Sequence, residues 1–144
     1  MLFRATLTLL LLLCPLTAFA EQDAAQSSSL VVMETSMGTF KIKLFDKKAP
    51  LSTENFRDYV NQGFYDGLIF HRVIPRFMAQ GGGFEPGMKK RNPTRSAVPN
   101  EASNGLKNKR GTLAMARTRN IHSATSQFFV NVVDNVSLDN RGTL

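Results

Sequence analysis

The sequence predicts one domain of mainly antiparallel β structure. Six short runs are rich in β-branched and aromatic residues, and glycine, proline and asparagine separate them, which is typical of strands joined by turns. Only one stretch has helical periodicity. Many short strands with a single amphipathic helix favour a β-barrel or a β-sandwich. No internal repeat or linker divides the chain, so we expect a single domain.

The first two strands are expected at residues 31–34 and 39–44. A short turn that contains Gly38 separates them, so we predict an antiparallel hairpin in which this glycine relaxes the turn. Pro50 is expected to end the second strand, because proline has no amide proton to donate to a strand ladder.

A helix is expected after the hairpin. Ser52 is a candidate N-cap, and the apolar side chains of Phe56, Tyr59 and Val60 repeat at i, i+3 and i+4. Gly63 is a natural stop. A helix of this length is expected to plug one end of a sheet rather than cross over it.

The remaining strands are short, and a long loop divides them. We expect them at residues 68–73, 77–80, 112–116 and 128–132. The segment between Gly81 and Gly111 contains three prolines, and a loop of this length in a compact domain usually indicates function or mobility.

Residues 70–84 have the composition of a binding site, with the sequence FHRVIPRFMAQGGGF. Side chains on a strand alternate between its two faces. Arg72 and the apolar side chains of Phe77 and Met78 can therefore converge on one concave surface if the turn between them redirects the chain. Gln80 then provides an amide that can hold the guanidinium.

Two later segments carry matching features. Residues 111–117 read GTLAMAR and include Ala116, and residues 126–131 read SQFFVN and include Gln127 and Phe129. Together with the first segment, they resemble the cyclophilin family of peptidyl-prolyl cis/trans isomerases. The resemblance implies a closed antiparallel β-barrel capped by helices, and an enzyme that needs neither a cofactor nor a metal ion.

The resemblance covers about residues 30–139, and it is greatest to the bacterial periplasmic cyclophilins, because of the QGGG run at residues 80–83 and the NEASNGL loop at residues 100–106. It implies that Arg72 is the catalytic arginine and that Gln80 orients it. The other positions that it assigns bind substrate: Phe77, Met78, Phe129 and Leu138 in a proline pocket, and Ala116, Arg117 and Gln127 along the edge that holds an extended peptide.

Each of these residues also has an ordinary structural interpretation. An arginine on a strand is usually solvated or part of a surface ion pair, and Met78 could simply fill a gap in a core. Adjacent strand residues point to opposite faces, so we assign Phe128 to the core and Phe129 to the pocket. The joint occurrence of the motifs at the family's spacing favours the binding site.

No metal site is expected. The two histidines, His71 and His122, have no third ligand at metal spacing, and the single cysteine lies in the first twenty residues. His71 follows the alternation of its strand and should face the interior, opposite Arg72, as a neutral, hydrogen-bonded imidazole.

The first twenty residues are typical of a cleavable signal peptide. They contain Arg4, a short apolar run at residues 7–13 and the small-x-small sequence AFA, so cleavage is expected before Glu21 and the protein is predicted to be periplasmic. A lipid anchor on Cys14 is the alternative, which its neighbours disfavour. Residues 21–29 form a flexible lead-in, and residues 30–144 form the cyclophilin-like domain.

After cleavage the chain would have a net charge of +6. Nucleic acid or anionic lipid could explain this charge, but the basic clusters at residues 89–91 and 107–110 lie in loops without interleaved aromatics, so solubility is the preferred explanation. We expect a monomer whose partners are X-Pro segments of unfolded or partly folded exported proteins, with no nucleic acid and no stable membrane anchor.

The sequence departs from the family at three places. Arg76 stands where a glycine is common, and Ser137 where an aromatic residue usually walls the cleft; both are expected to tune substrate preference. The chain also stops at Leu144, where cyclophilins continue. An incomplete domain is therefore expected, without its last strands and C-terminal helix, and two alternatives stay open: a proline-peptide-binding or holdase module without turnover, and an inactive remnant.

Overall fold

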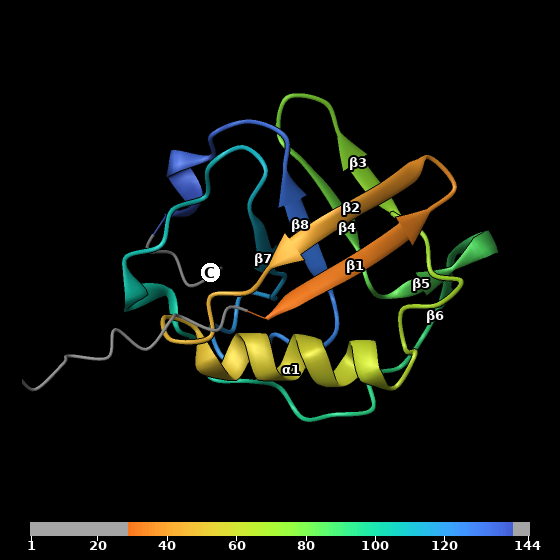
Figure 1. Ribbon diagram of the computed structural model, residues 1–144, viewed down its shortest axis with the longest axis horizontal. Coiled ribbons are helices and arrows are strands. Elements are labelled where there is room, and N and C mark those ends of the chain that lie inside the picture. The colour runs from red at the N-terminus through yellow and green to blue at the C-terminus, as the bar shows by residue number, and fades with distance from the viewer. Residues whose placement is uncertain (1–28, 140–144) are drawn as a thin grey trace, which may run out of the picture.

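The computed structural model describes residues 29–139, which form a mainly antiparallel β fold with one α-helix, as predicted (Figure 1). The predicted signal peptide and nearly all of the lead-in lie outside the described residues. The elements are β1 (Leu30–Thr35), β2 (Gly38–Lys43), α1 (Pro50–Asn61), β3 (Arg72–Ile74), β4 (Met78–Gly81), β5 (Phe84–Glu85), β6 (Lys89–Lys90), β7 (Leu113–Met115) and β8 (Phe128–Asn131), with short 3₁₀ turns at Pro86–Met88, Ala102–Asn104 and Val136–Leu138.

The predicted first hairpin is confirmed. β1 and β2 pair in antiparallel register from Leu30 opposite Lys43 to Thr35 opposite Gly38. Gly38 has a φ of 128°, which a residue with a side chain rarely adopts. The glycine therefore lies directly after the two-residue loop, as the first residue of β2, and allows the chain to turn there.

The start of the helix differs from the prediction. Ser52 is not the N-cap: α1 begins at Pro50, the first helical position, and the carboxylate of Glu101 accepts the backbone N–H groups of Leu51 and Ser52 at 3.0 and 2.7 Å. Proline suits this position because its missing N–H would have no partner in the helix. A carboxylate some fifty residues away thus takes the place of a local cap, and Pro50 starts the helix rather than ending β2.

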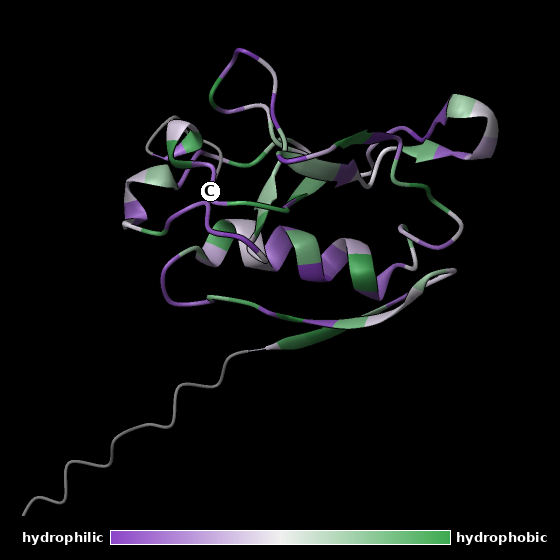
Figure 2. Ribbon diagram, turned by 90° about the horizontal axis from the view of Figure 1, so that it is seen from above, coloured by the Kyte–Doolittle hydropathy of each residue, from purple (hydrophilic) through white to green (hydrophobic). Residues whose placement is uncertain are grey.

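The end of the helix agrees with the prediction. Gln62 is the C-cap, and Gly63 follows with a φ of 63°, as is common after helices. The helix lies across one end of the hairpin and of the larger sheet, between the two layers (Figures 1 and 2).

Four short strands form the larger antiparallel sheet, in the order β3-β4-β8-β7. β3 begins at Arg72 rather than at residue 68, because the backbone of Ile69 instead binds the carbonyl of Phe84 at 2.9 Å. The strands of the described residues form three separate sheets, of two, four and two strands. Closure into a barrel stays a prediction.

The two faces of this sheet bury different clusters. Phe128 packs with Phe56 of α1, with Val31 and Leu44 from the hairpin segment and with Met115, which together form the main core. Phe129 points to the other face, against Met78 and Ala114. The opposite burial of two adjacent phenylalanines confirms that only Phe128 belongs to the main core.

The segment predicted as a long loop contains additional structure. β5 and β6 form a small hairpin, and Arg91, which follows it, holds it against the body of the domain. The guanidinium of Arg91 donates to Glu85 and to the carbonyls of Phe64 and Asp66, at 3.0, 2.7 and 3.0 Å. The contacts that order this segment are therefore distant in sequence.

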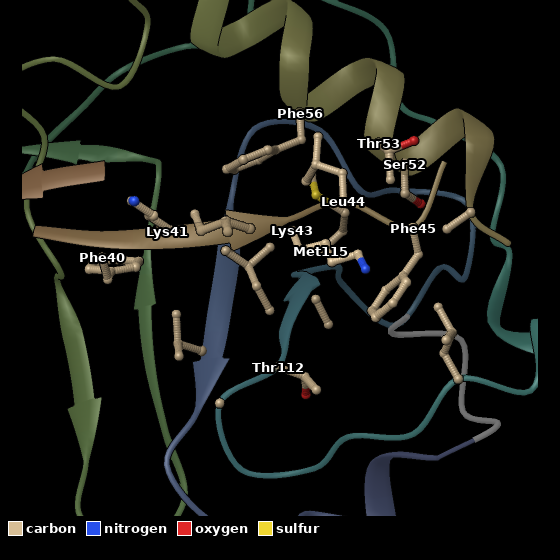
Figure 3. A pocket seen from close by; sticks show the side chains of 17 residues that line it. Phe40, Lys41, Lys43, Leu44, Phe45, Ser52, Thr53, Phe56, Thr112 and Met115 are labelled. Atoms are coloured by element: carbon tan, nitrogen blue, oxygen red, sulfur yellow. The ribbon is translucent and has the colours of Figure 1, made fainter. Parts of the chain in front are cut away.

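An apolar cavity of about 340 Å³ lies on the main-core face of the sheet (Figure 3). β2, β7, β8 and the first turns of α1 surround it, and Phe45, Leu44, Phe56 and Met115 are among the side chains that line it.

No helix of the described residues is long and apolar enough to cross a membrane.

Candidate functional site

The side chains of Arg72, Gln80 and Gln127 form a chain of hydrogen bonds on the face of the sheet opposite the main core. Gln80 lies directly across the β3–β4 ladder from Arg72, and its Oε1 accepts Nη1 of the guanidinium at 3.4 Å. Nε2 of Gln80 donates to Oε1 of Gln127 at 2.9 Å. The second glutamine therefore holds the first with its oxygen toward the arginine.

An apolar cluster lies beside this chain of amides. Arg72, Gln80, Phe129 and Ala114 occupy one row across the four strands, each opposite the next, and cross-strand neighbours lie in side-chain contact. Met78, Ala114 and Phe129 are almost fully buried. The partly buried residues packed against them are Ile74, Phe77, Ala116 and Leu138.

This arrangement brings together most of the side chains that the sequence assigned to the site. Phe77, Met78, Ala116, Phe129 and Leu138 share the apolar cluster. Arg72, exposed on β3, and Gln80 and Gln127 border it. Ala114 was not assigned from the sequence, although its alternation with Ala116 on the same strand could have indicated it.

β7 forms an edge of the four-stranded sheet in the described part of the chain. The backbone N–H of Ala116 donates to the carbonyl of Gln127 at 2.8 Å, so this amide is engaged within the sheet. Backbone groups alternate in direction along an antiparallel strand, so those of Met115, the last residue of β7, point away from β8. The guanidinium of Arg117, the next residue, donates to the carbonyl of Thr118 at 2.6 Å.

A network of buried asparagines supports the cluster from behind. Nδ2 of Asn135 donates to the carbonyl of Phe77 at 2.9 Å and to Oδ1 of Asn131 at 2.7 Å, and Nδ2 of Asn131 donates to Oδ1 of Asn108 at 3.2 Å. The backbone N–H of Leu138 donates to the carbonyl of Asn135 at 2.9 Å. Asn135 is therefore bonded to the backbone of both Phe77 and Leu138, two residues of the apolar cluster. No local sequence pattern predicted this network.

Two glycines allow the strands to approach closely at the edge of the site. A Cβ on Gly82 would lie 2.7 Å from the carbonyl oxygen of Ser126, and a Cβ on Gly83 would lie 2.7 Å from the side chain of Gln127. The glycine run therefore does more than form a turn. At Gly83 it leaves room for the amide that holds Gln80.

His71, which precedes Arg72, is half-buried and packs against Phe84, with ring centroids 4.4 Å apart. Burial lowers the pKa of His71 below its ordinary value, so the neutral form is favoured as expected. Its buried Nδ1 has no hydrogen-bond partner among the described residues, although a hydrogen bond to the backbone of Ile69 opposes part of this lowering of the pKa. Within residues 29–139, no group of three or more potential ligands could hold a metal ion.

The comparisons with known proteins identify the family. Residues 30–144 match the model of the family described as cyclophilin type peptidyl-prolyl cis-trans isomerase/CLD. The chain belongs to this cyclophilin family. The family membership that the three sequence motifs predicted is therefore confirmed.

Similar curated proteins include bacterial peptidyl-prolyl cis-trans isomerases. The chain is 58% identical to peptidyl-prolyl cis-trans isomerase A of Dickeya dadantii over 124 residues, which cover 86% of this chain and 65% of the relative. It is 59% identical to peptidyl-prolyl cis-trans isomerase B of Escherichia coli over 113 residues, which cover 78% and 68% of the two chains. The chain thus spans about two thirds of the length of these relatives.

A solved cyclophilin structure supports the fold. AquaCyp293 from Hirschia baltica is similar to this chain with a TM-score of 0.69 and 26% identity, over 81% of this chain and 61% of the other. The cyclophilin fold is therefore shared despite low identity.

Proposed function

We propose that this chain is a peptidyl-prolyl cis-trans isomerase, with Arg72 as its catalytic residue. The observation that carries the proposal is that Arg72 lies on the same face of the sheet as the apolar cluster of Phe77, Met78 and Phe129, with its guanidinium bonded to Gln80. A proline ring can pack on this cluster while the peptide bond before it lies near the guanidinium. The names of the bacterial relatives support the same activity.

The reaction makes and breaks no covalent bond. Amide resonance imposes a barrier of about 18–20 kcal/mol on rotation, and uncatalysed exchange of an X-Pro bond takes tens to hundreds of seconds. As the bond twists, resonance is lost and the prolyl nitrogen regains a lone pair. A cationic donor near this nitrogen binds the twisted state more strongly than the planar one, and such differential binding lowers the barrier.

The side chains around Arg72 favour this role because they fix the donor in advance. Gln80 accepts a hydrogen bond from the guanidinium, and Gln127 holds Gln80. A donor that is already oriented needs little reorganisation when the bond twists. The mechanism uses no nucleophile and no general base.

Substitution of Arg72 tests the proposal. Arg72→Ala should lower the rate of cis/trans exchange in an X-Pro test peptide, measured by NMR exchange, much more than it lowers affinity for the same peptide, measured by titration. Arg72→Lys keeps the charge but loses the planar donor geometry, so it should restore little of the rate. Equal losses of rate and affinity would remove Arg72 from the catalytic role. Binding without any acceleration by the wild-type protein would favour a proline-peptide-binding module instead.

We also infer that the substrates are X-Pro segments of exported proteins in the periplasm. The support is the signal-like composition of residues 1–20. Mass spectrometry of a periplasmic fraction should find a mature chain that begins at Glu21. A chain that retains residues 1–20 in the cytoplasm would contradict this inference.

A further inference from the structure

Most of the net positive charge of the described residues is concentrated on the segments that form the site. Residues 72–81 and 105–139 supply the side chains of the cluster and of the amide chain, and they contain seven cationic side chains and two carboxylates. The other described residues contain nine cationic side chains and seven carboxylates. The site segments therefore account for +5 of a net charge of +7. Their cations are Arg72, Arg76, Lys107, Lys109, Arg110, Arg117 and Arg119.

Neither carboxylate of these segments pairs with an arginine next to the apolar cluster. Asp139 lies 3.6 Å from the ammonium group of Lys107, and Asp134 lies 3.9 Å from that of Lys109. Arg72 and Arg76 are both exposed, and no carboxylate of the described residues forms an ion pair with either. Both cations are therefore available to an anionic ligand.

The backbone of Arg76 is strained in the turn that leads into the cluster. The N–H of Phe77 donates to the carbonyl of Ile74 at 3.1 Å, and Arg76 has a φ of 59°. With Pro75 before it, this is a type II turn, whose third residue requires a positive φ and favours glycine. An arginine in the left-handed region is unfavourable, and such strain is concentrated at functional sites. A role of the exposed guanidinium in ligand binding would explain why an arginine occupies this strained position.

The position of Arg76 fits contact with a bound peptide. It directly precedes Phe77, a wall of the cluster, whereas Arg72 lies two residues before Ile74, at the other end of β3. An extended peptide advances about 3.3 Å per residue. With its proline on the cluster, the residues that flank the proline pass within reach of a long arginine side chain.

We propose that Arg76 makes the site selective for X-Pro segments that carry an acidic residue within two positions of the proline. This inference rests on the proposed isomerase function. Because the cations border an apolar cluster, the favoured ligand presents an apolar ring and a carboxylate together, and an acidic X-Pro peptide presents both. Nucleic acid and anionic lipid present the charge without the proline ring.

The experiment compares pairs of X-Pro peptides. The two peptides of a pair are identical except at one position, which is glutamate in one and glutamine in the other. One pair is made for each of four positions: the two residues before the proline and the two residues after it. Exchange is measured by NMR at low salt and again at 0.5 M salt. The wild-type protein should give about two- to fivefold higher kcat/KM for the glutamate peptide at one of these positions, as expected for an exposed ion pair. High salt should remove the difference.

Three variants locate the effect. Arg76→Gln should abolish the preference for glutamate. Lys90→Gln removes one positive charge from the separate β5–β6 hairpin and is the matched control, so it should retain the preference. Arg76→Gly should also lose the preference, yet unfold at the same or a higher temperature than the wild type because it relieves the strained φ. Loss of selectivity in a variant that is at least as stable excludes misfolding as the cause.

Failure of this inference can be distinguished from failure of the proposed function. Equal kcat/KM for glutamate and glutamine peptides, or a preference that persists in Arg76→Gln, would overturn the role of Arg76 while leaving the isomerase intact. No acceleration of any peptide would overturn the isomerase itself. Binding of anionic vesicles or oligonucleotides that displaces the acidic peptide would show that the cations serve a different class of ligand, and would also overturn the inference.

Discussion

At the scale of single residues, the alternation of side chains along a strand carries most of the functional argument. It separates Phe128 from Phe129, and it places Arg72 on the same face as Gln80 and the apolar cluster. Both assignments could be made from the sequence because the period of a strand is a local property. The sequence could not show that Nε2 of Gln80 binds Gln127, since 47 residues separate the two amides.

The first prediction concerns the titration of His71. Burial lowers its pKa in the folded protein below the ordinary value of 6.5, and the nearby Arg72 cation lowers it further. Below pH 6.5 the unfolded chain therefore binds more protons at this residue than the folded chain does. Its contribution to stability is present above pH 6.5 and is lost as the pH falls toward the folded pKa.

We therefore expect the urea midpoint of unfolding to decrease between pH 7.5 and pH 5.5 at constant ionic strength. His71→Gln removes the titrating group and should flatten this part of the profile. A wild-type midpoint that stays constant over this range, or an equally steep profile in His71→Gln, would show that His71 does not control stability there.

At the scale of elements, the contacts that end or anchor a segment are often distant in sequence. The apolar periodicity of α1 and its terminal Gly63 were predictable, because both are local signals. The cap of its first turn was not predictable, because the cap is the carboxylate of Glu101, about fifty residues later in the sequence. The β5–β6 hairpin was missed for a similar reason, since Arg91 anchors it to the carbonyls of Phe64 and Asp66.

The second prediction concerns the glycine run after β4. A methyl group on Gly83 would lie 2.7 Å from the side chain of Gln127, which must then move away. Gly83→Ala should therefore release Gln80 and lower kcat/KM for X-Pro exchange by about two- to tenfold, as expected for the loss of one hydrogen bond. Because a flexible side chain takes up the displacement, the thermal midpoint should change little.

A double-mutant cycle checks this explanation. Gln127→Ala should lower kcat/KM by a similar factor, and adding Gly83→Ala to it should have no further effect, because the displaced group is already absent. Additive losses in the double variant would mean that Gly83 acts through another contact.

At the scale of the whole molecule, two features hold the layers in place: the main core around Phe56 and Phe128, and the buried network of Asn108, Asn131 and Asn135. The first could be predicted from apolar patterns. The second could not, because a buried asparagine has no local signature and its partners come from three separate segments. A buried amide without hydrogen-bond partners lowers the stability of the fold. The network therefore also specifies how the segments around the apolar cluster pack together.

The main core is open at the cavity between β2 and β7, where apolar side chains line a space of about 340 Å³ (Figure 3). The bacterial relatives are longer than this chain, which spans 65% of the Dickeya dadantii protein and 68% of the Escherichia coli protein. Further residues packed into the cavity would bury this apolar surface. Each 100 Å² so covered would contribute about 2.5 kcal/mol.

The third prediction follows from this surface. A hybrid in which the residues that follow the matched segment of the Escherichia coli relative are joined after Asp139 should unfold at higher urea concentration, bind less of a dye that reports exposed apolar surface, and show higher isomerase activity. Covering about 200 Å² would add about 5 kcal/mol, comparable with the whole stability of a small domain, which is about 5–15 kcal/mol. Leu113→Ala, in the cavity lining, should then cost more in the hybrid than in the original chain, whereas Val136→Ala, at an exposed position, should cost equally little in both. An unchanged urea midpoint and unchanged dye binding in the hybrid would show that the cavity is not where added residues pack.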